Sequence, residues 1–235
     1  HLFVAADLVP LFDGTLIDGL FVNDNAAALI GRSSDAIFIA IRGTNDLNTT
    51  EIIKGINDET FNTPDTNHWN NMDAHYALLA PIFAALEDYL TKHSTEIAKV
   101  YVTGYSLGAS MVQKYLSLHP NDTRFAAVTF GSPGYQGLAD DPTDQRVTNV
   151  MFNADPVALA KYFVQNIENY GNLGLPIYIA PPTGETYMSS DVAGTTPQVV
   201  LPLAPSFLGA YVTHSMEAYL EAARFIRLDD PGALR

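Results

Sequence analysis

The stretch that decides the fold is residues 100–118, VYVTGYSLGASMVQKYLSL. It begins with a short β-branched run at 100–103, which is typical of a buried strand, and continues at 107–118 as a helical run. The sequence GYSLG at 104–108 joins the two and matches the G-x-S-x-G pattern in the strand–turn–helix context that the pattern requires. Because its glycines permit a sharp reversal, Ser106 is predicted to project from the strand end at a helix N-terminus.

The alternation of strand and helix continues on both sides of this stretch. Short apolar runs predict further strands at 36–41, 126–130, 147–152, 177–180 and 198–201. Helical spacing of apolar residues predicts helices at 75–90 and 214–226. This order favours an α/β fold with a mostly parallel central sheet and helices on both faces. No repeat or second domain is visible, so residues 1–235 are predicted to form one domain.

One segment, residues 46–73, interrupts the alternation. It is polar, rich in asparagine and threonine, and shows little periodicity. Long connections inside compact domains are often functional, so we expect this segment to be a lid.

The composition excludes several classes of function. Aspartate and glutamate number 26 against 12 lysines and arginines, and the net charge of −14 repels phosphate backbones and anionic membranes. Nucleic acid is therefore not expected as a partner, and only local apolar surface could make a transient contact with a lipid interface. The chain has no cysteine, and its acidic clusters lack the spacing of zinc or calcium ligands, so neither a metal nor a cofactor is expected.

A serine hydroxyl needs a neighbouring base before it can act as a nucleophile. Two histidines follow Ser106 in the chain. His119 lies at the far end of the helix that starts after Ser106, roughly 20 Å away at about 1.5 Å per residue. The predicted base is therefore His214, at a loop-to-helix junction.

The acid of such a triad is expected directly after a strand and between the serine and the histidine in the chain. Asp155 meets both conditions, since it closely follows the strand predicted at 147–152. The alternative role for Asp155 is a helix N-cap before Pro156, and one carboxylate can do both. The other acidic residues lie in polar loops or follow no predicted strand: Asp140, Asp141, Asp144, Glu168, Glu185 and Asp191.

The oxyanion of an acyl-transfer intermediate needs preorganised donors. The backbone N–H of Leu107, directly after the nucleophile, is the first predicted donor. Thr44 is the second, because it closes the strand predicted at 36–41 and offers both its N–H and its hydroxyl. The alternative is that Arg42 and Thr44 are ordinary turn residues.

With these residues in place, the chain resembles the class 3 lipase family, the fungal-lipase-like branch of the α/β hydrolases. The resemblance spans roughly residues 37–214 and rests on IAIRGT at 39–44, VTGYSLGA at 102–109, TFGSP at 129–133, DPV at 155–157 and His214. It implies hydrolysis of acylglycerols or related lipid esters, an oxyanion donor at Thr44 and a lid after it.

The chain departs from the family pattern at several points. Tyr105 stands where the family often has histidine, and the family's His-x-Gly-Phe element after the lid is replaced by HW at 68–69 and HY at 75–76. Fungal members use disulfides, so the lack of cysteine indicates a bacterial-type chain or a domain of a larger protein. The chain starts at His1 without a signal segment, as a processed piece would, and we expect a secreted or extracellular protein.

Three functions fit this pattern. The first is a lipase or carboxylesterase that acts on lipid or small ester substrates. The second is a phospholipase A1, which would use the same triad with a different pocket and lid. The third is a non-catalytic module that binds lipid or a partner protein, because fold alone does not imply activity. The presence of Ser106, Asp155 and His214 in the required order argues against the third.

The segment 199–212 is apolar, broken by prolines and placed immediately before His214, so it is predicted to form the wall of an acyl pocket. The predicted substrate-binding residues are Tyr105, Val199, Val200, Leu201, Leu203, Phe207 and Leu208. Core packing is the alternative for each of these side chains.

The variant Phe207→Ala separates the two roles. If Phe207 lines the pocket, the ratio of kcat/KM for long and short esters shifts, since one methylene of fit is worth about 1–3 kcal/mol. If it belongs to the core, stability falls by about 3–5 kcal/mol and the ratio stays unchanged. A lower melting temperature with an unaltered ratio would refute the pocket assignment.

Overall fold

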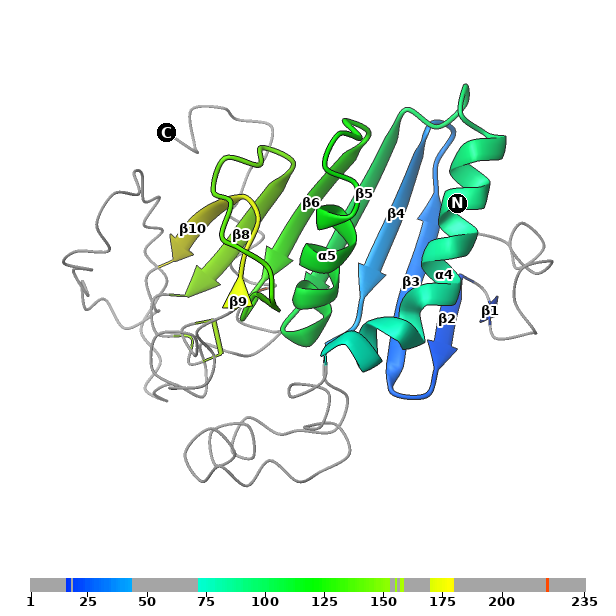
Figure 1. The fold of residues 1–235 in the computed structure, drawn as a ribbon. Coiled ribbons are helices and arrows are strands. Elements are labelled where there is room, and N and C mark those ends of the chain that lie inside the picture. Colours follow the sequence, from blue (N-terminus) through cyan, green and yellow to red (C-terminus); the bar gives the residue numbers. More distant parts are fainter. Residues whose placement is uncertain are drawn as a thin grey trace.

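The centre of the protein is an eight-stranded sheet with the order β1-β2-β3-β4-β5-β6-β8-β10 (Figure 1). The computed structural model describes residues 16–17, 19–43, 72–152, 155, 157–158, 170–179 and 219. The strands of this sheet are β1 (Leu16–Ile17), β2 (Leu20–Asn23), β3 (Ala26–Arg32), β4 (Ala36–Ile41), β5 (Lys99–Tyr105), β6 (Phe125–Phe130), β8 (Val147–Phe152) and β10 (Leu175–Ile179). A separate two-stranded antiparallel sheet pairs β7 (Tyr135–Gln136) with β9 (Tyr170–Gly171).

The strand directions divide the sheet into two parts. From β4 through β5, β6 and β8 to β10 every neighbouring pair is parallel. From β1 to β4 the pairs are antiparallel, so the N-terminal strands add a meander to one edge. The predicted α/β fold with a mostly parallel central sheet is confirmed.

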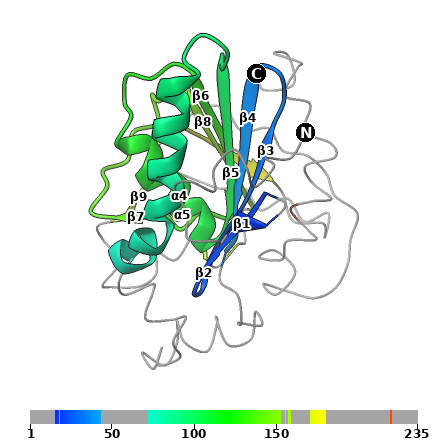
Figure 2. The same cartoon turned by 90° about the vertical axis from the view of Figure 1, so that its right-hand side faces the viewer.

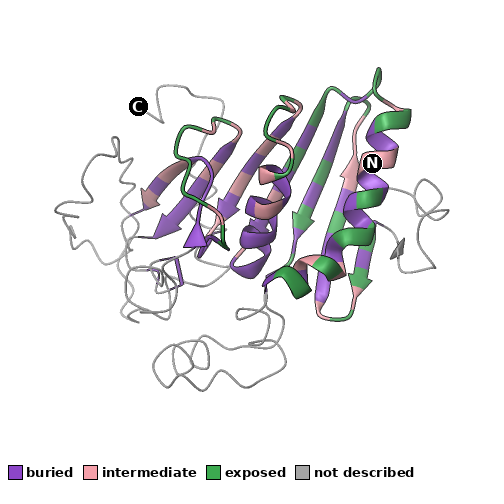
Figure 3. Cartoon of the chain, in the orientation of Figure 1, coloured by how far each residue is buried: buried purple, intermediate pink, exposed green. Residues whose placement is uncertain are grey.

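Two helices, α4 (Met72–Lys92) and α5 (Leu107–Ser117), lie on the same face of the sheet (Figure 2). The core beneath them takes alternate strand residues and the apolar stripes of both helices, among them Ile37, Ile39, Val100, Val102, Leu79, Leu86, Met111 and Leu116. Phe83 of α4 stacks on Tyr115 of α5 with ring centroids 4.3 Å apart, which joins the helices to each other. Figure 3 shows α5 buried along most of its length, whereas α4 exposes its outer side.

The opposite face carries a second, smaller core near the carboxyl ends of the parallel strands. Val150 and Phe152 of β8 and Ile179 of β10 pack there against Tyr219. Tyr219 is the one residue of the predicted helix 214–226 that the structure describes, and it is buried. Among the described residues, no helix combines the length and the apolar character needed to cross a membrane.

The predicted and observed bounds agree best for strands that are closed by turn residues. The predicted bounds of β4 and β8 are confirmed, and those of β5, β6, β10 and α5 differ by a few residues. Helix α4 starts at Met72 and continues through Pro81 to Lys92, so it includes the last two residues of the predicted lid. The rest of the predicted lid and the strand predicted at 198–201 lie outside the described residues.

The strands β1, β2 and β3 were not predicted. β2 and β3 form a hairpin whose turn contains Asp24 with a positive φ of 52°. Asp and Asn tolerate this conformation better than most residues, so Asn-Asp-Asn at 23–25 was the available signal.

A buried network of polar side chains joins α5 to the strands. Asn149 Oδ1 on β8 accepts hydrogen bonds from Gln113 Nε2 and Thr129 Oγ1, each at 2.5 Å. Asn149 Nδ2 donates to the carbonyl oxygen of Leu173 at 2.5 Å, and the Leu173 N–H donates to Gln113 Oε1 at 2.7 Å. The network therefore fixes the chain before β10 against both α5 and β8.

Replacing Asn149 by alanine should lower the free energy of unfolding by at least about 3 kcal/mol, because three buried partners lose a bond that is worth about 1–3 kcal/mol each. The control is Thr103→Val on β5, which removes a single bond from Thr103 Oγ1 to the Val128 carbonyl. Its expected loss is about 0.5–1.5 kcal/mol. Equal losses in urea unfolding would show that the network does not act as a unit.

Candidate active site

Ser106 occupies the turn between β5 and α5 in a strained conformation. Its φ of 54° and ψ of −124° are unusual for a residue other than glycine. The backbone holds it from both sides, since the Ser106 N–H donates to the Phe130 carbonyl at 2.9 Å and the Ser106 carbonyl accepts from the Ser110 N–H at 3.2 Å. Such strain persists only where the surrounding structure imposes it, and it is concentrated at functional sites.

Three glycines allow backbone segments to touch around Ser106. A Cβ atom on Gly104 would lie 2.5 Å from the Gly108 carbonyl oxygen, and one on Gly108 would lie 2.4 Å from the Ile41 carbonyl oxygen. A Cβ on Gly43 would lie 2.6 Å from the Tyr105 carbonyl oxygen and 3.3 Å from Ser106 Cβ. The end of β4, the end of β5 and the start of α5 therefore meet without side chains between them.

One of the two predicted oxyanion donors, Leu107, lies at this contact. Leu107 is the first residue of α5 and is fully buried, at a position where helical N–H groups have no intrahelical acceptor. Gly43 brings the loop after β4 against Ser106. Thr44, the next residue, lies outside the described residues, as does His214. The structure thus places Leu107 and the loop that leads to Thr44 beside the candidate nucleophile.

Asp155 lies three residues beyond the end of β8 and is fully buried. Its Oδ1 accepts hydrogen bonds from the N–H groups of Val157 at 2.8 Å and Ala158 at 3.1 Å. Its Oδ2 accepts a hydrogen bond from the Tyr219 hydroxyl at 2.5 Å. The capping contacts that the sequence offered as an alternative are therefore present at Oδ1, and Tyr219 binds the second oxygen.

Tyr219 is the residue of this site that the sequence did not assign, because its place on an apolar helical stripe indicated only core packing. Its hydroxyl accepts a hydrogen bond from the Phe152 N–H at 3.2 Å while it donates to Asp155. Burial, first, and the nearby charge of Asp155, second, raise the pKa of Tyr219 well above its ordinary value. The raised pKa favours the protonated phenol, which is the form that donates to Asp155.

His119, Asp140 and Asp144 have structural partners away from Ser106, whereas Glu168, Glu185 and Asp191 lie outside the described residues. His119 follows the end of α5, with Nε2 3.0 Å from Glu87 Oε1. Asp144 pairs with Arg146 at 2.5 Å, and the hydrogen bond from this guanidinium lowers the pKa of Asp144. Asp140 Oδ1 accepts from the Asn172 N–H at 2.8 Å. In the described part of the chain, no group of three or more histidines and carboxylates could hold a metal ion.

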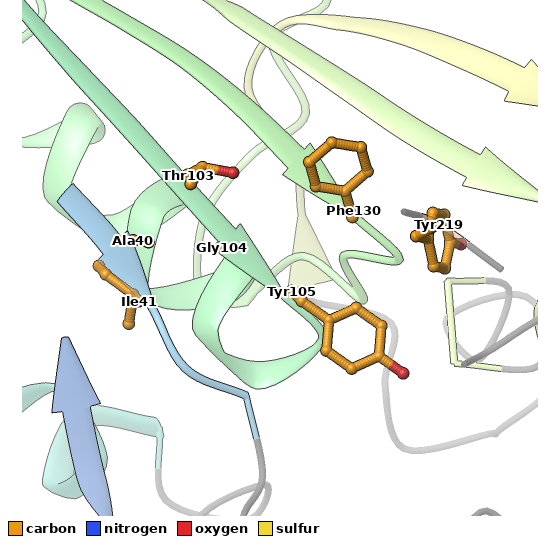
Figure 4. A pocket seen from close by; sticks show the side chains of 7 residues that line it. All are labelled: Ala40, Ile41, Thr103, Gly104, Tyr105, Phe130 and Tyr219. Atoms are coloured by element: carbon orange, nitrogen blue, oxygen red, sulfur yellow. The ribbon is translucent and has the colours of Figure 1, made fainter. Parts of the chain in front are cut away.

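An apolar cavity of about 240 Å³ lies on the second face of the sheet, beside the ends of β4, β5 and β6. Figure 4 shows Tyr105, Phe130 and Tyr219 among its lining residues. Tyr105, which was predicted to bind substrate, lines this cavity and directly precedes Ser106 in the sequence. The other predicted substrate-binding residues, at 199–208, lie outside the described residues.

Comparison with known proteins points to one family. The model of the family described as lipase (class 3) matches residues 38–164. No curated protein matches the chain.

Several solved structures are similar to this one. The extracellular lipase LipA from Serratia marcescens has 17% identity and a TM-score of 0.43, over 67% of this chain and 28% of that one. A lipase from Rhizopus microsporus var. chinensis has 19% identity and a TM-score of 0.43, over 65% and 56% of the two chains. A mutant of MDLA from Penicillium cyclopium has 16% identity and a TM-score of 0.45, over 73% and 66%. The chain thus spans about a quarter and about half of the first two relatives.

The close backbone contact at Gly108 can be tested with alanine. Gly108→Ala should displace the end of β4 from the turn, lower stability by about 1–3 kcal/mol and greatly slow the reaction of Ser106 with a phosphonate probe. The control is Gly137→Ala, where φ is +79° but nothing lies within 4 Å of the added Cβ. The control should lose a similar amount, about 1–2 kcal/mol, from φ alone and keep the wild-type labelling rate. Equal labelling of both variants would contradict the proposed contact.

Proposed function

Because the chain belongs to the class 3 lipase family, we propose that it is a serine hydrolase that cleaves carboxylic esters of lipids through Ser106, His214 and Asp155. The observation that carries the proposal is the conformation of Ser106, which sits at a positive φ between a central parallel strand and a helix N-terminus. A turn of this kind presents a nucleophile at the carboxyl edge of the sheet.

In the proposed reaction, Ser106 Oγ attacks the carbonyl carbon of the ester while His214 takes the hydroxyl proton. The carbonyl oxygen becomes an oxyanion, which the N–H of Leu107 and the donors of Thr44 stabilise. His214 then gives the proton to the departing alcohol, which leaves an acyl group on Ser106. Water, deprotonated by His214, attacks this acyl-enzyme and releases the carboxylic acid with Ser106 restored.

The role of Asp155 in this scheme is to orient the imidazole and to stabilise its protonated form. Two features support it: the carboxylate is fully buried after the parallel strand β8, and its oxygens accept bonds from two amides and one phenol. A buried carboxylate without such donors would be very unfavourable. The capping contacts use Oδ1, so we assign the contact with the imidazole to Oδ2.

The non-catalytic alternative is disfavoured by the same turn. A residue other than glycine in such a conformation costs about 1–3 kcal/mol, and a module that only binds would gain nothing from it. Phospholipase A1 activity remains the alternative within the same mechanism. We further propose that residues 46–71 act as a lid, that 199–212 line the acyl pocket and that the protein acts outside the cell.

Ser106→Ala should abolish hydrolysis of nitrophenyl esters, with a loss of about 10⁴-fold or more, because the hydroxyl is the nucleophile. Asp155→Asn and His214→Ala should also lose orders of magnitude, and double variants should lose little beyond the worse single one. His119→Ala is the matched control and should keep wild-type turnover. Full activity in the Ser106→Ala protein would refute the assignment.

The same assay separates the substrate classes. Nitrophenyl esters of increasing acyl length, run beside a phospholipid substrate, distinguish a lipase or carboxylesterase from a phospholipase A1. Preference for the phospholipid would favour the alternative while leaving the triad intact.

A further inference from the structure

One contact of the site lies outside the triad itself. Tyr219 and Asp155 are both buried, and the phenol donates to Oδ2 of the carboxylate at 2.5 Å. We propose that Tyr219 is a positioning residue that fixes the orientation of the Asp155 carboxylate for catalysis. This inference rests on the proposed function and names a residue that the triad requires in addition to its own members.

The direction of the phenol proton is set by the sheet. The hydroxyl oxygen accepts a hydrogen bond from the Phe152 N–H, at the last residue of β8. With one lone pair engaged in this way, the hydroxyl proton is directed to Asp155. The carboxylate is thereby tied to the end of β8, the strand that precedes it.

The carboxylate is held from two directions. Oδ1 accepts from the amides of Val157 and Ala158, and Oδ2 accepts from Tyr219, so rotation of the group breaks at least one bond. Each carboxylate oxygen has two acceptor sites, so a phenol and an imidazole N–H can bind Oδ2 together. These three contacts therefore fix the carboxylate through both of its oxygens.

Three neutral donors bind the Asp155 carboxylate: two amides and one phenol. Two other carboxylates are held by guanidinium groups, Asp122 by Arg124 and Asp144 by Arg146. A guanidinium would neutralise the charge that a protonated imidazole needs, whereas a phenol orients the carboxylate and preserves its charge. This difference suits an acid that must stabilise a cation during turnover.

The ring of Tyr219 also contacts the strand that leads to the nucleophile. Its centroid lies 4.7 Å from that of Phe152, 5.9 Å from that of Phe130 and 5.9 Å from that of Tyr105. Tyr105 is bonded directly to Ser106. One side chain, five positions after His214 in the sequence, therefore spans the ends of the strands that carry the nucleophile and the acid.

The test is Tyr219→Phe, which removes the hydroxyl and keeps the ring. The matched control is Tyr115→Phe, since Tyr115 is equally buried and donates to the carboxylate of Glu87 away from the turn. With a short soluble nitrophenyl ester, Tyr219→Phe should lower kcat by about 10-fold to 100-fold with KM unchanged. Tyr115→Phe should leave both constants unchanged. Unchanged kcat in Tyr219→Phe overturns the inference.

A double variant shows whether Tyr219 acts through Asp155. In the Asp155→Asn background, Tyr219→Phe should cause less than about a twofold further loss of kcat, because residues that act as a unit are not additive. If Tyr219→Phe lowers kcat in the Asp155→Asn background as much as it does in the wild type, the inference is overturned. It is also overturned if Tyr219→Phe fails to fold while Tyr115→Phe folds, because the Tyr219 hydrogen bond would then serve stability. Activity that survives Ser106→Ala would instead refute the proposed function, and the inference with it.

Discussion

The backbone contact around Ser106 is the constraint on which the rest of the structure depends. Strands β4 and β5 and helix α5 approach until carbonyl oxygens lie where a Cβ would stand on Gly43, Gly104 or Gly108. This approach lets β6 bind the Ser106 N–H and holds a strained residue at the carboxyl end of β5. Without it, the strain would relax and the hydroxyl would lose its fixed direction.

The turn at Ser106 is held rigid by the larger core on one face of the sheet and by the buried hydrogen bonds of the Asn149 network. The larger core packs α4 and α5 against the sheet, so α5 cannot move away from the turn that it follows. The Asn149 network then connects α5 to β8. Because β8 leads to Asp155, the supports of the candidate nucleophile and the candidate acid are connected through buried bonds instead of through flexible loops.

Local sequence pattern was sufficient to predict strands that consist of one short apolar run. β4 and β8 are short apolar runs closed by polar residues, and their bounds agree with the structure. β5 was predicted to end at Thr103 because Gly104 indicates a turn, yet its pairing with β6 continues to Tyr105. The hairpin of β2 and β3 was missed because alanines at 26–28 have weak strand propensity. The Asn149 network depends on residues far apart in the sequence, which no local pattern reveals.

Tyr219 shows the same limit within the site. On a helical stripe a tyrosine indicates core packing, and its ring does pack in the smaller core. The hydroxyl performs a second task that becomes visible only once β8 has placed Asp155 beside it. The phenol and the two amides of Val157 and Ala158 orient the carboxylate without cancelling its charge. In the proposed mechanism that charge stabilises the protonated base.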